Sequence, residues 1–262
     1  MVSISANGVN ASSLSGDEQV AARADLINRH LFMWQRLSST GRGELAGRFT
    51  DQVTGAPSQV DFTRALDMRR VGVMGHSRGG AAVTWHAADR HREQWPAGVN
   101  VKAVLALAPA YNVMTEDMAS YRIGGTPFAV MRGTCDGQVG QEALSFASDA
   151  TDRSTADVYQ YRVHGANHNY FNTQWSPSSG QVAAADDALD ADGGPAQCTD
   201  VDSSAVDRRL SEARQRQVGM TYVGAFFRRY LTDDRASQTL LEGRERPLSH
   251  LATIDVRSRV HP

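Results

Sequence analysis

The segment from residue 71 to residue 80 constrains the fold of this chain more than any other. It reads VGVMGHSRGG: an apolar run, then the pattern G-x-S-x-G, then small residues. This order is typical of a strand that turns sharply into a helix with a serine, here Ser77, exposed on the turn. The glycines at Gly75 and Gly79 are expected to let the neighbouring backbones approach closely. Ser77 is therefore predicted to be a nucleophile, with the Arg78 N–H as an oxyanion donor.

Apolar runs alternate with helical and polar segments along the rest of the chain. The runs typical of strands cover residues 101–109, 127–132 and 158–163, and helices are expected at 17–37, 81–88, 142–148 and 210–231, with a short one near 62–66. On the last long helix, Met220, Val223, Phe227 and Tyr230 are expected to form one apolar stripe. This alternation predicts an α/β fold, a mostly parallel sheet with helices on both faces. Residues 1–231 are predicted to form the domain, and 232–262 an extension of unknown role with one strand at 251–256.

A resemblance to a known superfamily rests on these features. Residues 2–231 resemble the α/β-hydrolase superfamily, and the GHSRGG turn resembles that of chlorophyllases and of bacterial esterases of the dienelactone-hydrolase and polyester-hydrolase type. The resemblance implies an α/β-hydrolase fold and a serine esterase. In this superfamily the catalytic residues follow the order serine, acid, histidine.

The acid is expected just after the strand that ends near residue 132. Asp136 lies there in a Gly-x-x-Asp-x-x-Val pattern that resembles the acid loop of these esterases. A carboxylate at this place lies on the same rim as the nucleophile, where it can orient the imidazole of the base. Glu116 and Asp117, which follow the preceding strand, are the alternatives.

The base is expected after the next strand, where the sequence reads HGANHNY. His168 follows a Gly-Ala-x-His loop that resembles the base loop of the superfamily, whereas His164 stands at the end of the strand itself. His168 is therefore the predicted base, and His164 is the alternative. Ser77, Asp136 and His168 together predict acyl transfer through an acyl-enzyme, which needs no metal or organic cofactor.

Charge and hydropathy exclude several kinds of partner. The net charge is −2, and no run of about 18 apolar residues exists, so neither nucleic acid nor a transmembrane segment is expected. Asp186, Asp187, Asp190 and Asp192 match no known calcium loop and are expected to be solvated. The expected substrate is a small or polymeric ester. The alternatives are a lipase, cutinase, polyester hydrolase or chlorophyllase-like enzyme, or a catalytically weak binding module with this fold.

Cys135 and Cys198 are the two cysteines of the chain. A disulfide between them is favoured over two free thiols, and it would hold the polar segment 176–206 beside the acid. The first residues do not have the pattern of an export signal. The family resemblance implies an extracellular protein, whereas a chain complete as written would be cytoplasmic.

The first residues admit two interpretations. Val2–Ser5 is either the third strand of the hydrolase sheet, with Gly8-Val9 giving the second oxyanion N–H, or the fourth strand. The second is favoured because residues 2–5 and 22–26 resemble the fourth strand and following helix of polyester-hydrolase-like esterases. It predicts that Val2–Ser5 does not pair with Val71–Met74. It also predicts that the first three strands and the second oxyanion donor are missing from this chain.

Overall fold

A computed structural model gives the structure of this protein and describes residues 1–111, 116–151, 153–181, 197–199 and 205–261. Its centre is a five-stranded sheet in the order β1-β2-β3-β4-β7. The strands are β1 (Val71–His76), β2 (Val101–Leu107), β3 (Phe128–Gly133), β4 (Val158–Val163) and β7 (Ile254–Arg259). The first four are parallel, and β7 runs antiparallel to β4. The predicted α/β class is therefore confirmed.

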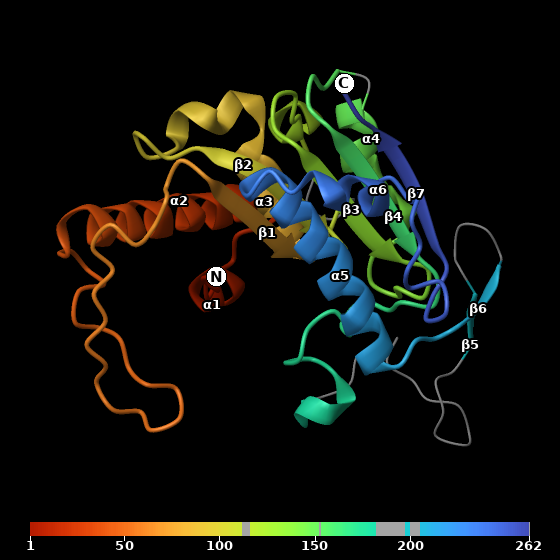
Figure 1. The fold of residues 1–262 in the computed structure, drawn as a ribbon, viewed down its shortest axis with the longest axis horizontal. Helices are drawn as coiled ribbons and strands as arrows, with labels where there is room; N and C mark the ends of the chain where they lie inside the picture. Colours follow the sequence, from red (N-terminus) through yellow and green to blue (C-terminus); the bar gives the residue numbers. More distant parts are fainter. Residues whose placement is uncertain (112–115, 152, 182–196, 200–204, 262) are drawn as a thin grey trace.

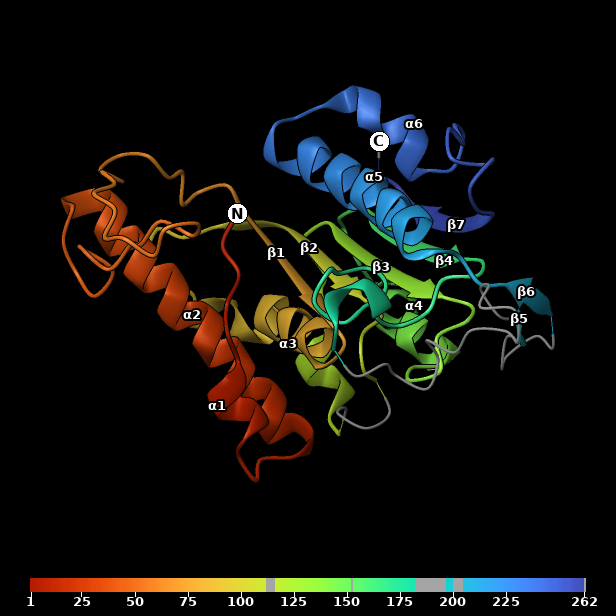
Figure 2. The ribbon, with the colours of Figure 1, turned by 90° about the horizontal axis from the view of Figure 1, so that it is seen from below.

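Helices cover both faces of this sheet (Figures 1 and 2). On one face lie α2 (Gly16–Thr40), α3 (Arg78–Ala87) and α4 (Ser145–Thr151), and on the other lie α5 (Glu212–Leu231) and α6 (Gln238–Leu241). Each face has its own apolar core: one contains Val83, Val104 and Phe128, and the other contains Leu105, Tyr161 and Phe226. Strands buried on both faces read as continuous apolar runs, which is why β2 and β3 were recognisable in the sequence.

The remaining elements are short and lie in the connections. They are α1 (Asn7–Asn10), the 3₁₀ helices η1 (Asp89–Gln94), η2 (Met118–Tyr121), η3 (Gln141–Leu144), η4 (Pro177–Ser179) and η6 (Arg235–Ser237), and a two-stranded sheet of β5 (Gln197–Thr199) and β6 (Val206–Arg208). Most of the polar segment 176–206, including the predicted solvated aspartates, lies outside the described residues.

The first residues differ from both interpretations of the sequence. Residues 2–5 have no regular secondary structure, so the strand predicted there is wrong, and Val9 lies in the short helix α1. Within the described residues, no strand pairs with this segment to accept its backbone hydrogen bonds, and Val2 is exposed. In the part of the chain that the structure describes, β1 pairs only with β2 and forms an edge of the sheet. The prediction that Val2–Ser5 does not pair with Val71–Met74 is thus confirmed.

Two further local predictions need correction. Residues 62–66 form a turn instead of a short helix, and Phe62 packs its ring against Trp34 of α2. On α5 the buried face is formed by residues 215, 218, 219, 222, 225 and 226, and Met220 is 70% exposed. Of the predicted stripe, Val223, Phe227 and Tyr230 are partly buried and pack against the same core, so Met220 is the misplaced member. The most buried side of α5 is the one that contacts Tyr159 and Tyr161 of β4.

The tail after residue 231 contributes to the same sheet. Strand β7 begins at Ile254, three residues later than predicted, and pairs with the whole of β4, from Val158 opposite Arg259 to Val163 opposite Ile254. Helix α6 packs beside α5 over that edge (Figure 2). The sheet therefore includes residues on both sides of the boundary expected at residue 231.

Candidate active site

Ser77 occupies the turn between β1 and α3. Its backbone has φ 56° and ψ −124°, a conformation that costs a non-glycine residue about 1–3 kcal/mol. The surrounding backbone holds it there: the Ser77 N–H donates to the Leu107 carbonyl at 3.0 Å, and the Ala110 N–H donates to the Ser77 carbonyl at 3.1 Å. A serine held in this way at the carboxyl end of a parallel strand matches the geometry expected of a nucleophile elbow.

The glycines around the serine have unequal roles. A Cβ at Gly75 would collide with the Gly79 carbonyl, so no side chain fits there. At Gly79 itself a Cβ would meet nothing within 4 Å, whereas at Gly80 it would come within 2.8 Å of Pro109. The expectation that both Gly75 and Gly79 permit close approach is therefore correct for Gly75 alone, and Gly80 is the second tight position.

Asp136 and His168 are brought together on the rim next to this elbow. Nδ1 of His168 lies 2.9 Å from Oδ2 of Asp136, and both residues are buried. The other carboxylate oxygen, Oδ1, accepts the N–H groups of Gln138 and Val139, each at 2.9 Å. These bonds fix the carboxylate, which in turn orients the imidazole of His168 through Nδ1.

His76, the residue before Ser77, connects the loop that carries His168 to the turn that carries Ser77. Its Nε2 donates to the backbone carbonyl of His168 at 3.0 Å, and the centres of the two rings are 4.5 Å apart. The His168 ring therefore lies against the residue that precedes Ser77. His76 occupies the variable position of the G-x-S-x-G motif, so the sequence alone predicted no role for it.

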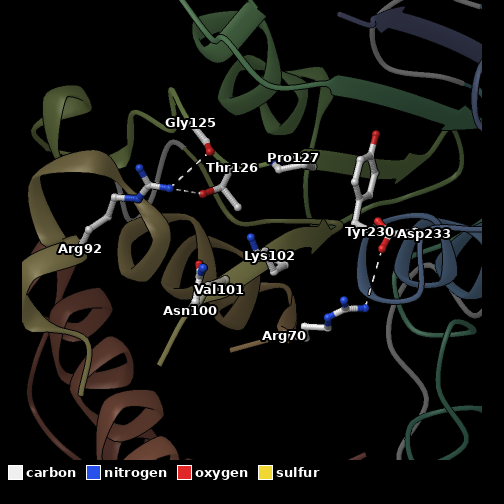
Figure 3. A pocket seen from close by; sticks show the side chains of 10 residues that line it. All are labelled: Arg70, Arg92, Asn100, Val101, Lys102, Gly125, Thr126, Pro127, Tyr230 and Asp233. Carbon is white, nitrogen blue, oxygen red and sulfur yellow. Dashed lines mark hydrogen bonds and ion pairs between the residues drawn. The ribbon is translucent and has the colours of Figure 1, made fainter. Parts of the chain in front are cut away.

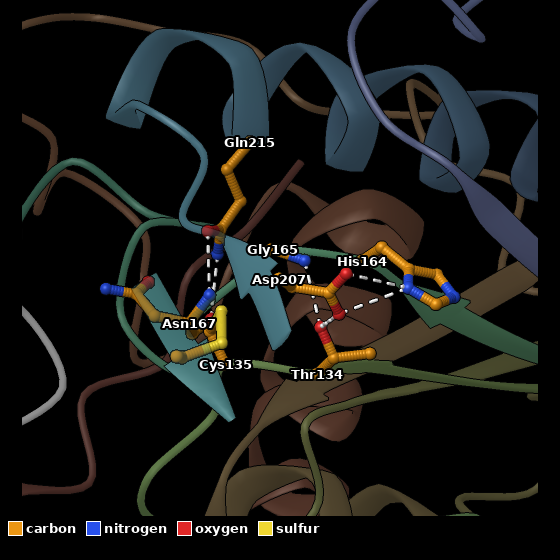
Figure 4. Close-up of a disulfide and its surroundings, with 8 residues drawn as sticks. Thr134, Cys135, His164, Gly165, Asn167, Asp207 and Gln215 are labelled. Carbon is orange, nitrogen blue, oxygen red and sulfur yellow. Dashed lines mark hydrogen bonds and ion pairs between the residues drawn. A yellow bond between two sulfur atoms is a disulfide. The ribbon is translucent and has the colours of Figure 1, made fainter. Parts of the chain in front are cut away.

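Gln215 of α5 is a second supporting residue that the sequence analysis missed (Figure 4). Its amide is fully buried, accepts the Asn167 N–H at 2.9 Å and donates to the Asn167 carbonyl at 2.8 Å. Both backbone polar groups of Asn167, the residue before His168, are thereby held by the side chain of Gln215. Gln215 could have been recognised as a polar residue on the buried face of α5. The apolar stripe predicted for this helix did not include that position.

A disulfide joins Cys135 and Cys198, with the Cα atoms 5.4 Å apart (Figure 4). Cys135 directly precedes Asp136, and its N–H donates to the Ala166 carbonyl of the base loop at 2.9 Å. Cys198 lies in β5, opposite Asp207 of β6. The disulfide thus fastens this hairpin to the loop that carries Asp136.

His164, the alternative base, is engaged elsewhere. Its Nδ1 lies 3.1 Å from Oδ2 of Asp207, and its Nε2 lies 2.9 Å from Oδ2 of Asp255 in β7. Burial lowers the pKa of His164, but the hydrogen bonds to Asp255 and Asp207 outweigh it, so the pKa is raised above its ordinary value. The Thr134 hydroxyl donates to the same Asp207 carboxylate at 2.6 Å. Held by two carboxylates, His164 is a structural link among β4, β6 and β7.

The alternative acids also have other partners. Asp117 forms an ion pair with Arg90 at 2.7 Å and accepts the Ala119 N–H as the cap of η2. Glu116 lies next to Gly16 at the start of α2. Asp136 is thus the carboxylate that the structure brings to His168, at 2.9 Å.

Several aromatic side chains lie on the loop that follows His168. The Trp175 ring is 51% exposed and its centre lies 6.4 Å from that of His76. Tyr170 is buried, and Phe171 packs against Gly219 of α5. Trp175 is therefore an exposed apolar surface near the elbow, whereas Tyr170 and Phe171 serve packing.

A cavity of about 340 Å³ lies at the opposite end of the sheet, where β1, β2 and β3 begin (Figure 3). It is lined by Arg70, Arg92, Asn100, Val101, Lys102, Gly125, Thr126, Pro127, Tyr230 and Asp233. Arg70 pairs with Asp233 at 3.7 Å, and Arg92 donates to Thr126 at 2.6 Å. Active sites of parallel α/β sheets lie at the carboxyl ends of the strands, so this cavity is separate from the candidate site.

Other kinds of site receive no support from the described residues. Among them, no group of three or more His, Cys, Asp or Glu side chains is arranged to hold a metal ion. The helices described in the structure include none long and apolar enough to cross a membrane.

Comparisons with known proteins agree with this fold. Residues 38–127, well under half of the chain, match the model of the prolyl oligopeptidase family, and this segment contains Ser77. A solved structure of a ferulic acid esterase from Streptomyces cinnamoneus is similar, with a TM-score of 0.53 and 21% sequence identity. The match covers 94% of this chain and 57% of that one, so this chain spans little more than half the length of its structural neighbour. No curated protein matches the sequence.

Proposed function

With the α/β-hydrolase fold as the premise, we propose that the protein is a serine hydrolase that cleaves carboxylic esters. Ser77 is the nucleophile, His168 the general base and Asp136 the acid that orients it. The observation that carries the proposal is the buried contact of 2.9 Å between His168 and Asp136, on a loop held against the elbow by His76. A strained serine beside a histidine that is itself oriented by a carboxylate is the arrangement acyl transfer requires.

The reaction proceeds in two steps. His168 takes the proton from Ser77 as Oγ bonds to the ester carbonyl carbon, and the alcohol then leaves with that proton as the carbon–oxygen bond breaks. Water, deprotonated by His168, attacks the acyl-enzyme and releases the carboxylic acid and free Ser77. The Arg78 N–H, at the first position of α3, has no partner within the helix and is the donor to the oxyanion.

Reaction with a fluorophosphonate probe tests the proposal most directly. We expect the probe to label Ser77 and to abolish hydrolysis of para-nitrophenyl acetate. Ser77→Ala should lose labelling and lower kcat by about 10³-fold or more, since the nucleophile is removed. Ser39→Ala, an exposed serine on α2, is the matched control and should behave as the wild type. Labelling that persists in Ser77→Ala would overturn the assignment.

The substrate class has two candidates with separate support. The neighbouring structure is named a ferulic acid esterase, and the exposed Trp175 near the elbow gives an aromatic ester a surface to pack on. The partial match to the prolyl oligopeptidase family favours peptides as a second class. Comparing para-nitrophenyl esters with para-nitroanilides of the same acyl group separates them, and we expect the esters to be cleaved preferentially. An extracellular location is part of the proposal, because disulfides such as Cys135–Cys198 persist in oxidising compartments.

A further inference from the structure

Two guanidinium groups converge on one amide oxygen at the start of α3. Arg78 directly follows Ser77, and its Nη1 donates to Oε1 of Gln19 at 3.4 Å. Arg23, one helical turn after Gln19 on α2, donates to the same oxygen at 3.2 Å. One amide oxygen therefore lies between two cations, at the point where α2 meets the start of α3.

The inner member of this pair is buried without a counter-charge. Arg23 is 7% exposed, its Nη2 also donates to Asn10 at 2.5 Å, and its Nε is buried with no hydrogen-bond partner. Burial, and after it the charge of Arg78, lower the pKa of Arg23. Buried charged side chains are normally paired, because an uncompensated charge is costly away from water.

The nearest carboxylates of α2 do not supply the missing charge. Asp17, at the start of the helix, accepts the N–H groups of Glu116 and Asp117 and the hydroxyl of Tyr121, at 3.1, 2.8 and 2.6 Å. Over the described ranges of the chain, neither Arg23 nor Arg78 forms an ion pair; their hydrogen bonds go to the amide oxygens of Gln19 and Asn10. The pair is thus arranged to receive an anion from outside the protein.

We infer that Arg78 and Arg23 bind a carboxylate carried by the substrate, so that the preferred ester is a monoester with a free acid group. The inference rests on the proposed function, because Arg78 directly follows Ser77 in the chain. Guanidinium groups bind carboxylates through paired, charge-assisted hydrogen bonds, which are stronger than neutral ones. The buried position of Arg23 strengthens this attraction by lowering the local dielectric, and the exposed Arg78, whose charge salt screens, guides the anion to it.

Matched substrates test the inference on the intact protein. One pair, mono-para-nitrophenyl adipate and para-nitrophenyl hexanoate, differs by a carboxylate on the acyl side. The other, para-acetoxybenzoate and its methyl ester, differs by a carboxylate on the alcohol side. In one of the two pairs we expect the wild type to prefer the anionic ester by about tenfold in kcat/KM, equivalent to about 1.4 kcal/mol. The preference should shrink as salt is added.

Substitutions assign that preference to the arginine pair. Arg23→Gln and Arg78→Gln should each remove most of it, and the exposed Arg78 keeps the test valid if Arg23→Gln fails to fold. Arg29→Gln, an exposed arginine further along α2, is the control and should keep both the preference and the basal activity. Equal kcat/KM for both members of both pairs in the wild type, or a preference that survives both substitutions, would overturn the inference.

A binding measurement separates this inference from the proposed function. In Ser77→Ala protein, calorimetry should detect monomethyl adipate and a roughly tenfold loss of its affinity when Arg23→Gln or Arg78→Gln is added. If wild-type protein hydrolyses no ester, the proposed function fails, and this measurement still decides whether the anion site exists. Absence of binding, or affinity unchanged by both substitutions, would refute the site whether or not the enzyme is active.

Discussion

Replacing Gln215 by methionine should destabilise the protein far more than the same change elsewhere on α5. The fully buried Gln215 amide makes two hydrogen bonds, at 2.9 and 2.8 Å, to the N–H and carbonyl of Asn167. Methionine has a similar size and helix propensity but takes both partners away. Losing the partner of a buried polar group costs about 1–3 kcal/mol. For two groups, we expect the free energy of unfolding to fall by about 2–5 kcal/mol.

Urea denaturation followed by tryptophan fluorescence measures this change. Gln217→Met is the matched control, because Gln217 is exposed two residues away on the same helix, and its effect should stay within about 0.5 kcal/mol. A Gln215→Met protein within about 1 kcal/mol of the wild type would refute the reasoning, because the Asn167 peptide would then satisfy its groups without Gln215.

The same substitution also tests whether Gln215 positions the base. Asn167 precedes His168, so freeing its peptide allows the imidazole to shift relative to Ser77. A misplacement of about 1 Å in a catalytic group can cost about 10²-fold in rate. We therefore expect kcat for para-nitrophenyl acetate to fall by up to about 10²-fold in the folded variant, with KM changed less. An unchanged kcat would mean that His76 and Asp136 hold His168 without help from Gln215.

The other predictions concern the acid, the disulfide and His164. Asp136→Asn should lower kcat by about 10³–10⁴-fold while the protein stays folded, because an amide cannot stabilise the imidazolium; retention of a tenth of the activity would contradict the role of Asp136. Peptide mapping without reductant should recover a Cys135–Cys198 cross-link, and two freely alkylated thiols would disprove it. The pKa of His164 is raised in the folded state, so its contribution to stability is complete below its unfolded pKa of about 6.5 and is lost as the pH rises through the folded value. His164→Gln should therefore lower the melting temperature more at about pH 6 than at about pH 9, and an equal loss at both would show that His164 acts through packing alone.

Features that depend on local sequence were predictable from the chain alone. The apolar runs of β2 and β3 predict buried strands, and α3 follows directly after the glycine-rich turn at Ser77. Ser77, Asp136 and His168 were predicted from motifs that each lie within a few residues of a strand end. The structure brings Asp136 and His168 within 2.9 Å of each other because their strands, β3 and β4, are parallel neighbours.

Features that depend on pairing between distant segments were decided only by the tertiary structure. Val2–Ser5 alternates two β-branched apolar residues with two serines, a pattern typical of a strand, but a strand exists only where another strand accepts its hydrogen bonds, and none does so in the described fold. The partner of β7 and the buried face of α5 were likewise undetermined, because both depend on which surface of β4 is available. Gln215 and Arg23 acquire their roles in the same way. In the sequence each is an ordinary polar residue of a helix. Gln215 becomes important because it is buried against Asn167, and Arg23 because it is buried beside Arg78.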